Sequence, residues 1–250
     1  MGTAPRKSEG NMSKRFLVFQ HMPWEGPGQH LIRSARKQRV RLDIVEAWHQ
    51  AIPNVKPYDG IIVLGGQPNV GQEKEYPFLK AEKEVIRLGL KADRAYLGFC
   101  LGHQLLADAL GARIGPNFCR SVGFITGHTT KDGRRHAMFG GMPGSFPLFK
   151  WHGQAVLPPL PKEIEVLVTS AECEVEAISA RGRPHIVGLQ FDNHAAAISD
   201  VSVWAKKDQK WLLHPPGVDR AGLVKDAGKH EASMGEQFGL MFTNYIKMIS

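Results

Sequence analysis

The sequence lacks any apolar run close to the roughly 20 residues that a membrane-spanning helix requires. Residues 1–14 also lack the apolar core of a secretory signal, because they are polar and contain Gly, Pro and Ser. We therefore predict a disordered tail over residues 1–14, a single domain over residues 15–250 and no membrane partner. The hydrophobic share of 42% and charged share of 22% are typical of a globular protein.

Cysteine is scarce, with only Cys100, Cys119 and Cys173 in 250 residues. The three are far apart, odd in number and not arranged as Cys-x-x-Cys, which argues against a disulfide framework and a zinc site. Free thiols fit a reducing compartment. We predict a cytoplasmic protein without a bound metal.

Motifs for nucleotide binding are also missing. The sequence has no Gly-x-x-x-x-Gly-Lys-Ser/Thr loop, no Ser-Gly-Gly-x-Asp loop and no Gly-x-Gly-x-x-Gly fingerprint. Net charge is +8, but the basic residues are scattered, and the densest run, residues 33–41, is typical of a solvated helix face followed by a loop. We expect no cofactor and no nucleic-acid partner.

What the sequence does contain is alternation of short apolar runs with helical patterns. The predicted strands cover residues 15–20, 61–64, 95–98, 146–151, 166–169, 175–178 and 186–191, and the predicted helices cover 77–90, 101–110, 198–206 and 237–249. Strands alternate with helices early and follow one another later. This order predicts an α/β fold with three layers, in which a mixed, mainly parallel sheet carries helices on both faces.

The segment with the clearest chemical meaning is Gly98-Phe99-Cys100-Leu101-Gly102, between a predicted strand and a predicted helix. This is the G-x-nucleophile-x-G pattern of a nucleophile elbow. Glycines allow a tight turn, and free amides at the helix start favour a thiolate and lower the pKa of the thiol. On spacing alone, an inert buried cysteine is an equally good interpretation.

The segments around this elbow resemble those of class I glutamine amidotransferases. Residues 100–107 resemble the family's nucleophile segment, residues 58–68 its oxyanion strand and loop, residues 151–156 its substrate-binding turn, and residues 188–191 the strand before its catalytic histidine. The four segments follow the family's order and spacing over residues 15–206. In particular, the chain resembles stand-alone proteins that are similar to the amidotransferase domain of GMP synthase. This resemblance implies a flavodoxin-like fold.

The resemblance implies a mechanism. Cys100 would attack the side-chain amide of glutamine, the amides of Gly66 and Leu101 would hold the oxyanion, and water would clear the γ-glutamyl thioester. A histidine would give its proton to the departing ammonia. The resemblance also implies a set of substrate-binding residues: Gly65, Gln104, Trp151, Gly153 and Gln154.

The sequence departs from the family at the catalytic histidine. The family usually has Gln-Phe-His-x-Glu, whereas this chain has Asp192 at the histidine position and His194 at the glutamate position. In one hypothesis, strand alternation keeps Asp192 and His194 on one face, so His194 serves as the base and either Asp192 or a distant acid orients it. In the other, Asp192 replaces the histidine and raises the pKa of the thiol. Further departures at Ser121 and Gln154, expected in the glutamine pocket, leave the substrate open.

Three functions follow from these features. The first is a glutaminase-type enzyme that releases ammonia for an unknown acceptor or partner. Since no synthase domain is recognisable in this chain, the acceptor would belong to a separate chain, such as a synthase subunit, or be absent. The second is a related cysteine hydrolase of γ-glutamyl or other C–N amide bonds. The third is a catalytically decayed, amidotransferase-like binding subunit. The sequence favours the first and leaves the oligomeric state open.

Overall fold

The computed structural model of the protein describes residues 14–213 and 217–249. The tail predicted for residues 1–14 lies outside the described residues, except for Lys14. In chain order the strands are β1 (Arg15–Gln20), β2 (Arg41–Glu46), β3 (Gly60–Val63), β4 (Ala95–Phe99), β5 (Arg113–Thr129), β6 (Ser145–Leu157), β7 (Ile164–Ser170), β8 (Ala177–Ala180) and β9 (Arg183–Leu189). The helices are α1 (Gln29–Lys37), α2 (Phe78–Lys91), α3 (Leu101–Ala109), α4 (Lys131–Arg135), α5 (Ile198–Lys207), α6 (Gln209–Leu212) and α7 (Arg220–Met248), with 3-10 turns η1 (Ala137–Phe139) and η2 (Asn193–Ala195).

The strands form one nine-stranded sheet in the order β2-β1-β3-β4-β9-β8-β7-β5-β6. Strands β2, β1, β3, β4 and β9 pair in parallel, and β9, β8, β7, β5 and β6 pair antiparallel. Parallel neighbours need long crossovers, and helices supply them in the first half of the chain. The α/β fold with a mixed sheet predicted from the sequence is confirmed.

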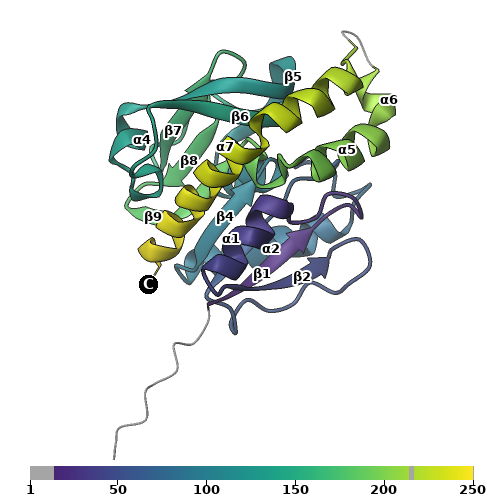
Figure 1. Cartoon of the computed structure of the whole chain (residues 1–250). Coiled ribbons are helices and arrows are strands. Elements are labelled where there is room, and N and C mark those ends of the chain that lie inside the picture. Colours follow the sequence, from purple (N-terminus) through teal and green to yellow (C-terminus); the bar gives the residue numbers. More distant parts are fainter. Residues whose placement is uncertain (1–13, 214–216, 250) are drawn as a thin grey trace, which may run out of the picture.

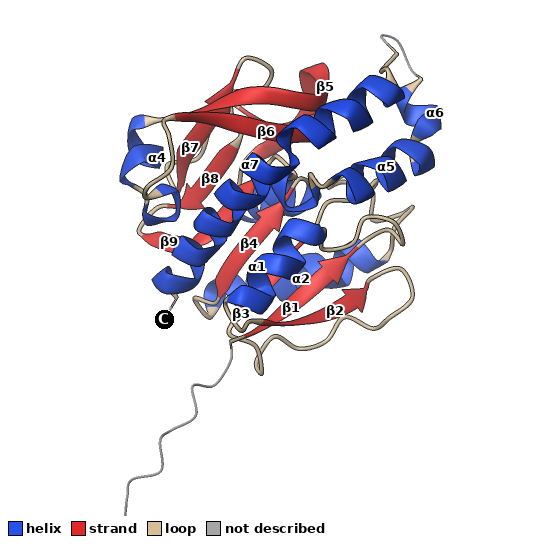
Figure 2. Cartoon of the chain, viewed as in Figure 1, coloured by secondary structure: helices blue, strands red, loops and turns tan. Residues whose placement is uncertain are grey.

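The sheet is buried on both faces, and β1 shows how the sequence achieves this. Phe16 and Val18 belong to one apolar cluster, which includes residues of α1 and α7, while Leu17 and Phe19 belong to another, which includes residues of α2 and α3. All four side chains are fully buried, and each contributes about 1.5–3 kcal/mol relative to an exposed position. Figure 1 shows α1 and the long α7 over the same face of the sheet, and Figure 2 shows the helices lying over the strands.

The sequence-based elements need three corrections. The run at residues 33–41 is not only helix and loop, because Arg41 begins β2, and β5 was not expected at all. The last helix begins at Arg220 rather than near residue 237. Among the described residues, none of these helices is both long and apolar enough to span a bilayer.

Candidate active site

Cys100 lies on a sharp turn between β4 and α3. Its φ of 45° and ψ of −102° are unusual for a residue with a side chain, and such conformations cost about 1–3 kcal/mol. Two backbone hydrogen bonds hold the turn: the Cys100 amide donates to the Leu189 carbonyl (2.9 Å), and the Gln104 amide donates to the Cys100 carbonyl (3.1 Å). The chain therefore maintains a strained elbow at this sulfur.

The two glycines of the elbow are required by close packing. A Cβ on Gly98 would lie 2.5 Å from the Gly102 carbonyl carbon, and a Cβ on Gly102 would lie 2.2 Å from the Val63 carbonyl oxygen. Real Cβ atoms do not come so close to backbone atoms. The absence of side chains at these two glycines thus allows the start of α3 to pack directly against β3.

One main-chain donor, the amide of Leu101, lies beside the Cys100 sulfur. The Leu101 amide is oriented to stabilise the thiolate. A Cβ on Gly65 would lie 3.4 Å from the Cys100 Cβ, so the 65–66 loop is in contact with the elbow. Gly66 allows close approach of His21 behind the loop, where a Cβ would lie 2.7 Å from that residue's own Cβ.

His21 anchors this loop to α2. Its Nδ1 donates to the Gly65 carbonyl (2.8 Å), and its Nε2 lies 3.0 Å from a Glu82 carboxylate oxygen. Burial lowers the pKa of His21, but the charge and hydrogen bond of Glu82 outweigh burial and raise it above 6.5. A buried, charge-assisted pair therefore fixes the loop that carries Gly65 and Gly66.

The elbow opens into a cavity of about 370 Å³. Its walls include all the predicted site residues except His194: Gly65, Gly66, Cys100, Leu101, Gln104, Trp151, Gly153, Gln154 and Asp192. Gln104 Nε2 donates to the Gln154 carbonyl and to Gln190 Oε1, both at 3.1 Å. The Cys100 sulfur faces the Trp151 carbonyl at 3.9 Å. Ser121, expected in this pocket, does not line it, and its hydroxyl donates to Glu172 (2.5 Å).

Asp192 lies in the cavity wall beside Cys100, at the position where the family has histidine. Its backbone amide donates to the Phe149 carbonyl (2.8 Å), which holds the residue against β6. The side chain is 1% exposed, and its Oδ1 has no hydrogen-bond partner among the described residues. Burial raises the pKa of this carboxyl well above its usual value.

His194 is not brought to the cavity. The expected strand continuation is wrong: β9 ends at Leu189, and the chain turns into η2, so period-two alternation does not reach His194. The imidazole stacks on Phe99 with ring centroids 4.2 Å apart, and its Nδ1 lies 3.9 Å from the nearest Asp192 oxygen, beyond hydrogen-bonding distance. Burial lowers its pKa to about 3.

The surroundings of Cys100 oppose ionisation of the thiol. Burial raises its pKa well above the usual value, and the carboxyls of Asp192 and Glu25 raise it further. The Lys150 ammonium and the Leu101 amide act in the opposite direction but do not outweigh these effects. At neutral pH the sulfur is therefore a protonated thiol, whereas the nucleophile in cysteine chemistry is the thiolate.

Sequence reasoning missed several residues of the cavity wall. Glu25, Trp204, Asp208 and Trp211 all line it. Asp208 accepts hydrogen bonds from Trp151 Nε1 (2.9 Å) and from Gln67 Nε2 (3.2 Å). Glu25 lies in a turn-rich loop and Asp208 between α5 and α6, outside any motif, so no sequence signal identified them.

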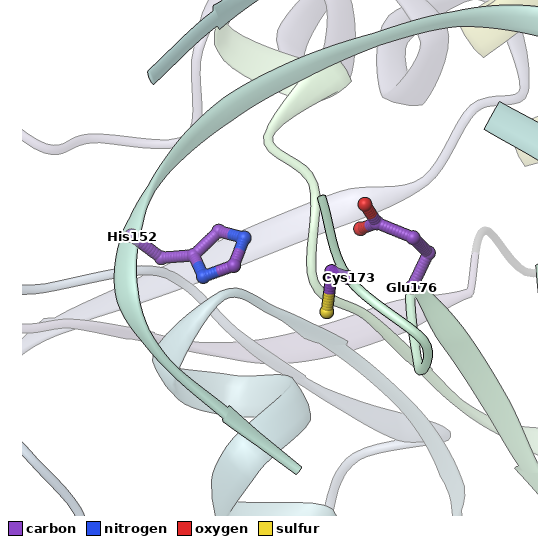
Figure 3. A group of neighbouring side chains, drawn as sticks. All are labelled: His152, Cys173 and Glu176. Atoms are coloured by element: carbon purple, nitrogen blue, oxygen red, sulfur yellow. The ribbon is translucent and has the colours of Figure 1, made fainter. Parts of the chain in front are cut away.

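A group of possible metal ligands lies beside the cavity. His152, Cys173 and Glu176 are buried, and their ligand atoms lie within 4.8 Å of one another. Figure 3 shows the three neighbouring side chains. However, Glu176 forms a fully buried ion pair with the Lys150 ammonium and accepts a hydrogen bond from Ser170 (2.6 Å). Because a cation already neutralises this carboxylate, we assign no metal to the group.

The fold and the site together define an α/β protein with a cysteine on a nucleophile elbow. A sequence model of the family "Glutamine amidotransferase class-I" matches residues 27–194, which is more than half of the chain. The chain belongs to this family.

Relatives are similar over much of the chain. A glutamine-hydrolysing GMP synthase of Thermomicrobium roseum is 33% identical over 170 residues, covering 67% of this chain and 29% of that protein. One subunit of the glutamine-hydrolysing GMP synthase of Methanocaldococcus jannaschii is 28% identical over 178 residues, covering 68% of this chain and 85% of that protein. The chain thus matches less than a third of the first relative's length.

A solved glutamine amidotransferase of Thermotoga maritima has a similar fold. It superposes with a TM-score of 0.83 and 24% identity, covering 94% of this chain and 99% of that chain. At this level of identity the likeness concerns the fold.

Proposed function

We propose that the cavity binds glutamine or another γ-glutamyl compound and that the chain acts as a binding member of the family rather than as an efficient glutaminase. The observation that carries this proposal is the composition of the wall around Cys100. Two carboxyls, from Asp192 and Glu25, act on the sulfur, and His194 lies outside the cavity. The site keeps the parts that position an amide but lacks an imidazole that could activate the thiol.

Ligand binding is supported by the features that remain. The elbow, the Gly65–Gly66 loop and the Gln104 side chain surround one cavity, as the glutamine site of the family requires. Cavities that bind small ligands commonly measure about 300–1,000 Å³, so 370 Å³ fits a compact amino-acid derivative.

Weak catalysis is supported by the lack of an effective proton acceptor among the described residues of the cavity wall. His152 is an imidazole in the wall, but its Nδ1 is paired with the Gln154 carbonyl (2.8 Å) and its ring faces Cys173 and Glu176 (Figure 3). Burial lowers the pKa of His152 well below 6.5, which makes it a weak base. An efficient base requires a pKa near the working pH.

Slow hydrolysis is the second candidate, and the strained elbow favours it, because an inert thiol needs no such conformation. In this scheme Asp192 accepts the thiol proton while the sulfur bonds to the amide carbon. The proton then passes to the nitrogen as the C–N bond breaks, and water releases glutamate from the thioester. Since one relative is a subunit of a glutamine-hydrolysing GMP synthase, the ammonia would pass to a separate synthase subunit.

The decisive experiment restores the family motif. Wild type should bind glutamine in calorimetry but release ammonia only at background rates. The double variant Asp192→His/His194→Glu should gain at least about 100-fold in ammonia release, because it supplies a general base with its acidic partner.

A matched control is the same double variant with Cys100→Ser, in which the gain should disappear. Absence of binding by wild type of glutamine and of every γ-glutamyl compound tested would refute the binding site. Cys100-dependent ammonia release by wild type, unimproved by the double variant, would refute the binding role in favour of hydrolysis.

A further inference from the structure

The cavity beside Cys100 has an unusual balance of charge. Glu25, Asp192 and Asp208, here called the carboxylate cluster, all line it, and each is at most 5% exposed. No lysine or arginine is found among the described residues of its wall. The buried ammonium of Lys150, which reaches the site through its charge, is already paired with Glu176.

One member of the carboxylate cluster, Asp192, is not satisfied within the described part of the protein, whereas Asp208 accepts hydrogen bonds from Trp151 and Gln67. Asp192 Oδ1 is buried in the wall without any hydrogen-bond partner among the described residues. Burial and the charges of Asp208 and Asp192 raise the pKa of Glu25 well above its usual value, so these carboxyls repel one another. An unpartnered buried carboxylate oxygen costs free energy that a bound cationic group would recover.

Aromatic rings complete the cavity wall. Trp151 packs against Trp204 with ring centroids 5.7 Å apart and against Trp211 with centroids 6.2 Å apart. All three rings line the cavity. The guanidinium of Arg120, which is not among the residues lining the cavity, lies 5.2 Å from the centre of the Trp211 ring. Tryptophan is the side chain that binds cations best through its face.

Glutamine alone matches this wall poorly, because a zwitterion has no net charge and brings its own carboxylate toward the carboxylate cluster. We infer that the preferred ligand is a γ-glutamyl amide whose amine portion carries an additional ammonium group, such as the conjugate of a diamine. The ammonium would occupy the space between the carboxylate cluster and the tryptophan rings. This inference rests on the proposed function, since it assumes that the γ-glutamyl portion binds beside Cys100.

The test uses two ligands that differ only in charge. These are the γ-glutamyl amide of 1,4-diaminobutane and the γ-glutamyl amide of pentylamine, in which a methyl group replaces the ammonium. Calorimetry with the full-length chain should show the cationic ligand binding about tenfold tighter or more. The preference should shrink as salt concentration rises.

Variants assign the preference to the cavity. Glu25→Gln keeps the shape of the side chain and removes its charge, so it should reduce the ratio of the two affinities several-fold. Asp226→Asn removes one charge from the exposed surface of α7 and should leave the ratio unchanged. Urea unfolding of both variants shows whether they are folded.

The outcomes separate this inference from the proposed function. Equal binding of both amides and glutamine would overturn the inference and leave the binding function intact. If 1,4-diaminobutane binds and none of the γ-glutamyl compounds does, the cavity is a cation site and the proposed function is refuted. Absence of binding by all these ligands would overturn both.

Discussion

At Cys100, the backbone and the charge environment act in opposite directions. The strained turn and the Leu101 amide are arranged to present a thiolate, whereas burial and the carboxyls of Asp192 and Glu25 hold the proton on the sulfur. This opposition can be measured directly, because alkylation by iodoacetamide follows the fraction of thiolate.

We expect Cys100 to be alkylated slowly at neutral pH. The rate should rise about tenfold per pH unit as the pH is raised toward the elevated pKa. Because the carboxyl of Asp192 raises the pKa of the Cys100 thiol, Asp192→Asn should lower the thiol pKa and speed labelling several-fold at a given pH. Peptide mass mapping measures each cysteine separately.

Cys119 provides the internal control for this measurement. Burial and then Glu172 raise its pKa, and the remaining charges that act on it are those of Lys150 and Glu176. Its labelling should therefore be unaffected by Asp192→Asn. Rapid labelling of wild-type Cys100 at pH 7, faster than Cys119, would show that the sulfur is activated after all.

At the scale of elements, the contact between α3 and β3 decides whether the elbow forms. Gly102→Ala places a methyl group 2.2 Å from the Val63 carbonyl oxygen, so the helix start must move away from the strand. We expect a loss of at least about 3 kcal/mol in the free energy of unfolding, measured by urea denaturation.

Gly71→Ala is the matched control, because a Cβ there meets nothing within 4 Å. Its unfolding curve should overlay that of wild type to within about 0.5 kcal/mol. Similar losses in the two variants would mean that the contact with β3 is not the cause, because helix propensity and chain entropy both favour alanine over glycine.

The central elements were predictable because their signals are local. Residues 16–19 of β1, and all residues of β3 and β4, are buried and form short apolar runs, so pattern alone identifies them. The sequence did not predict β2, because it is an edge strand in which Arg41, Leu42 and Asp43 are exposed or half-exposed. The sequence did not predict the first half of α7, because Gly222, Gly228 and Gly235 interrupt its helical pattern.

The candidate site was predictable only where it follows motifs. The elbow and the substrate turn converge on one cavity, as their family resemblance implied. The turn at η2 was not predictable, because it depends on Asn193, whose side chain accepts from the Phe149 amide (2.7 Å) and donates to the Pro147 carbonyl (3.0 Å). Such a long-range contact leaves no periodic signal in the sequence.

At the scale of the whole molecule, the interior holds many ionisable groups. His21 with Glu82 and Lys150 with Glu176 are buried as pairs, which balances their charges. His103 and His194 instead are buried as neutral rings, and burial lowers the pKa of each to about 3. Acid must therefore lower the free energy of unfolding of the entire fold, because these imidazoles take up protons readily in the unfolded chain.

His194→Phe tests this coupling, since a phenyl ring can still stack on Phe99 but cannot titrate. Between the unfolded pKa of about 6.5 and the folded pKa of about 3, the unfolded wild-type chain binds a proton at residue 194 that the folded chain does not. The free energy of unfolding of wild type should therefore fall, relative to the variant, by about 1.4 kcal/mol per pH unit within that window. Above about pH 7.5 the difference should be constant. Urea midpoints at pH 7.5, 6 and 5 measure it, and the titratable neighbours Asp192 and His30 are present in both chains. Parallel pH profiles would mean that His194 takes up its proton in the folded state, as an imidazole available for catalysis would.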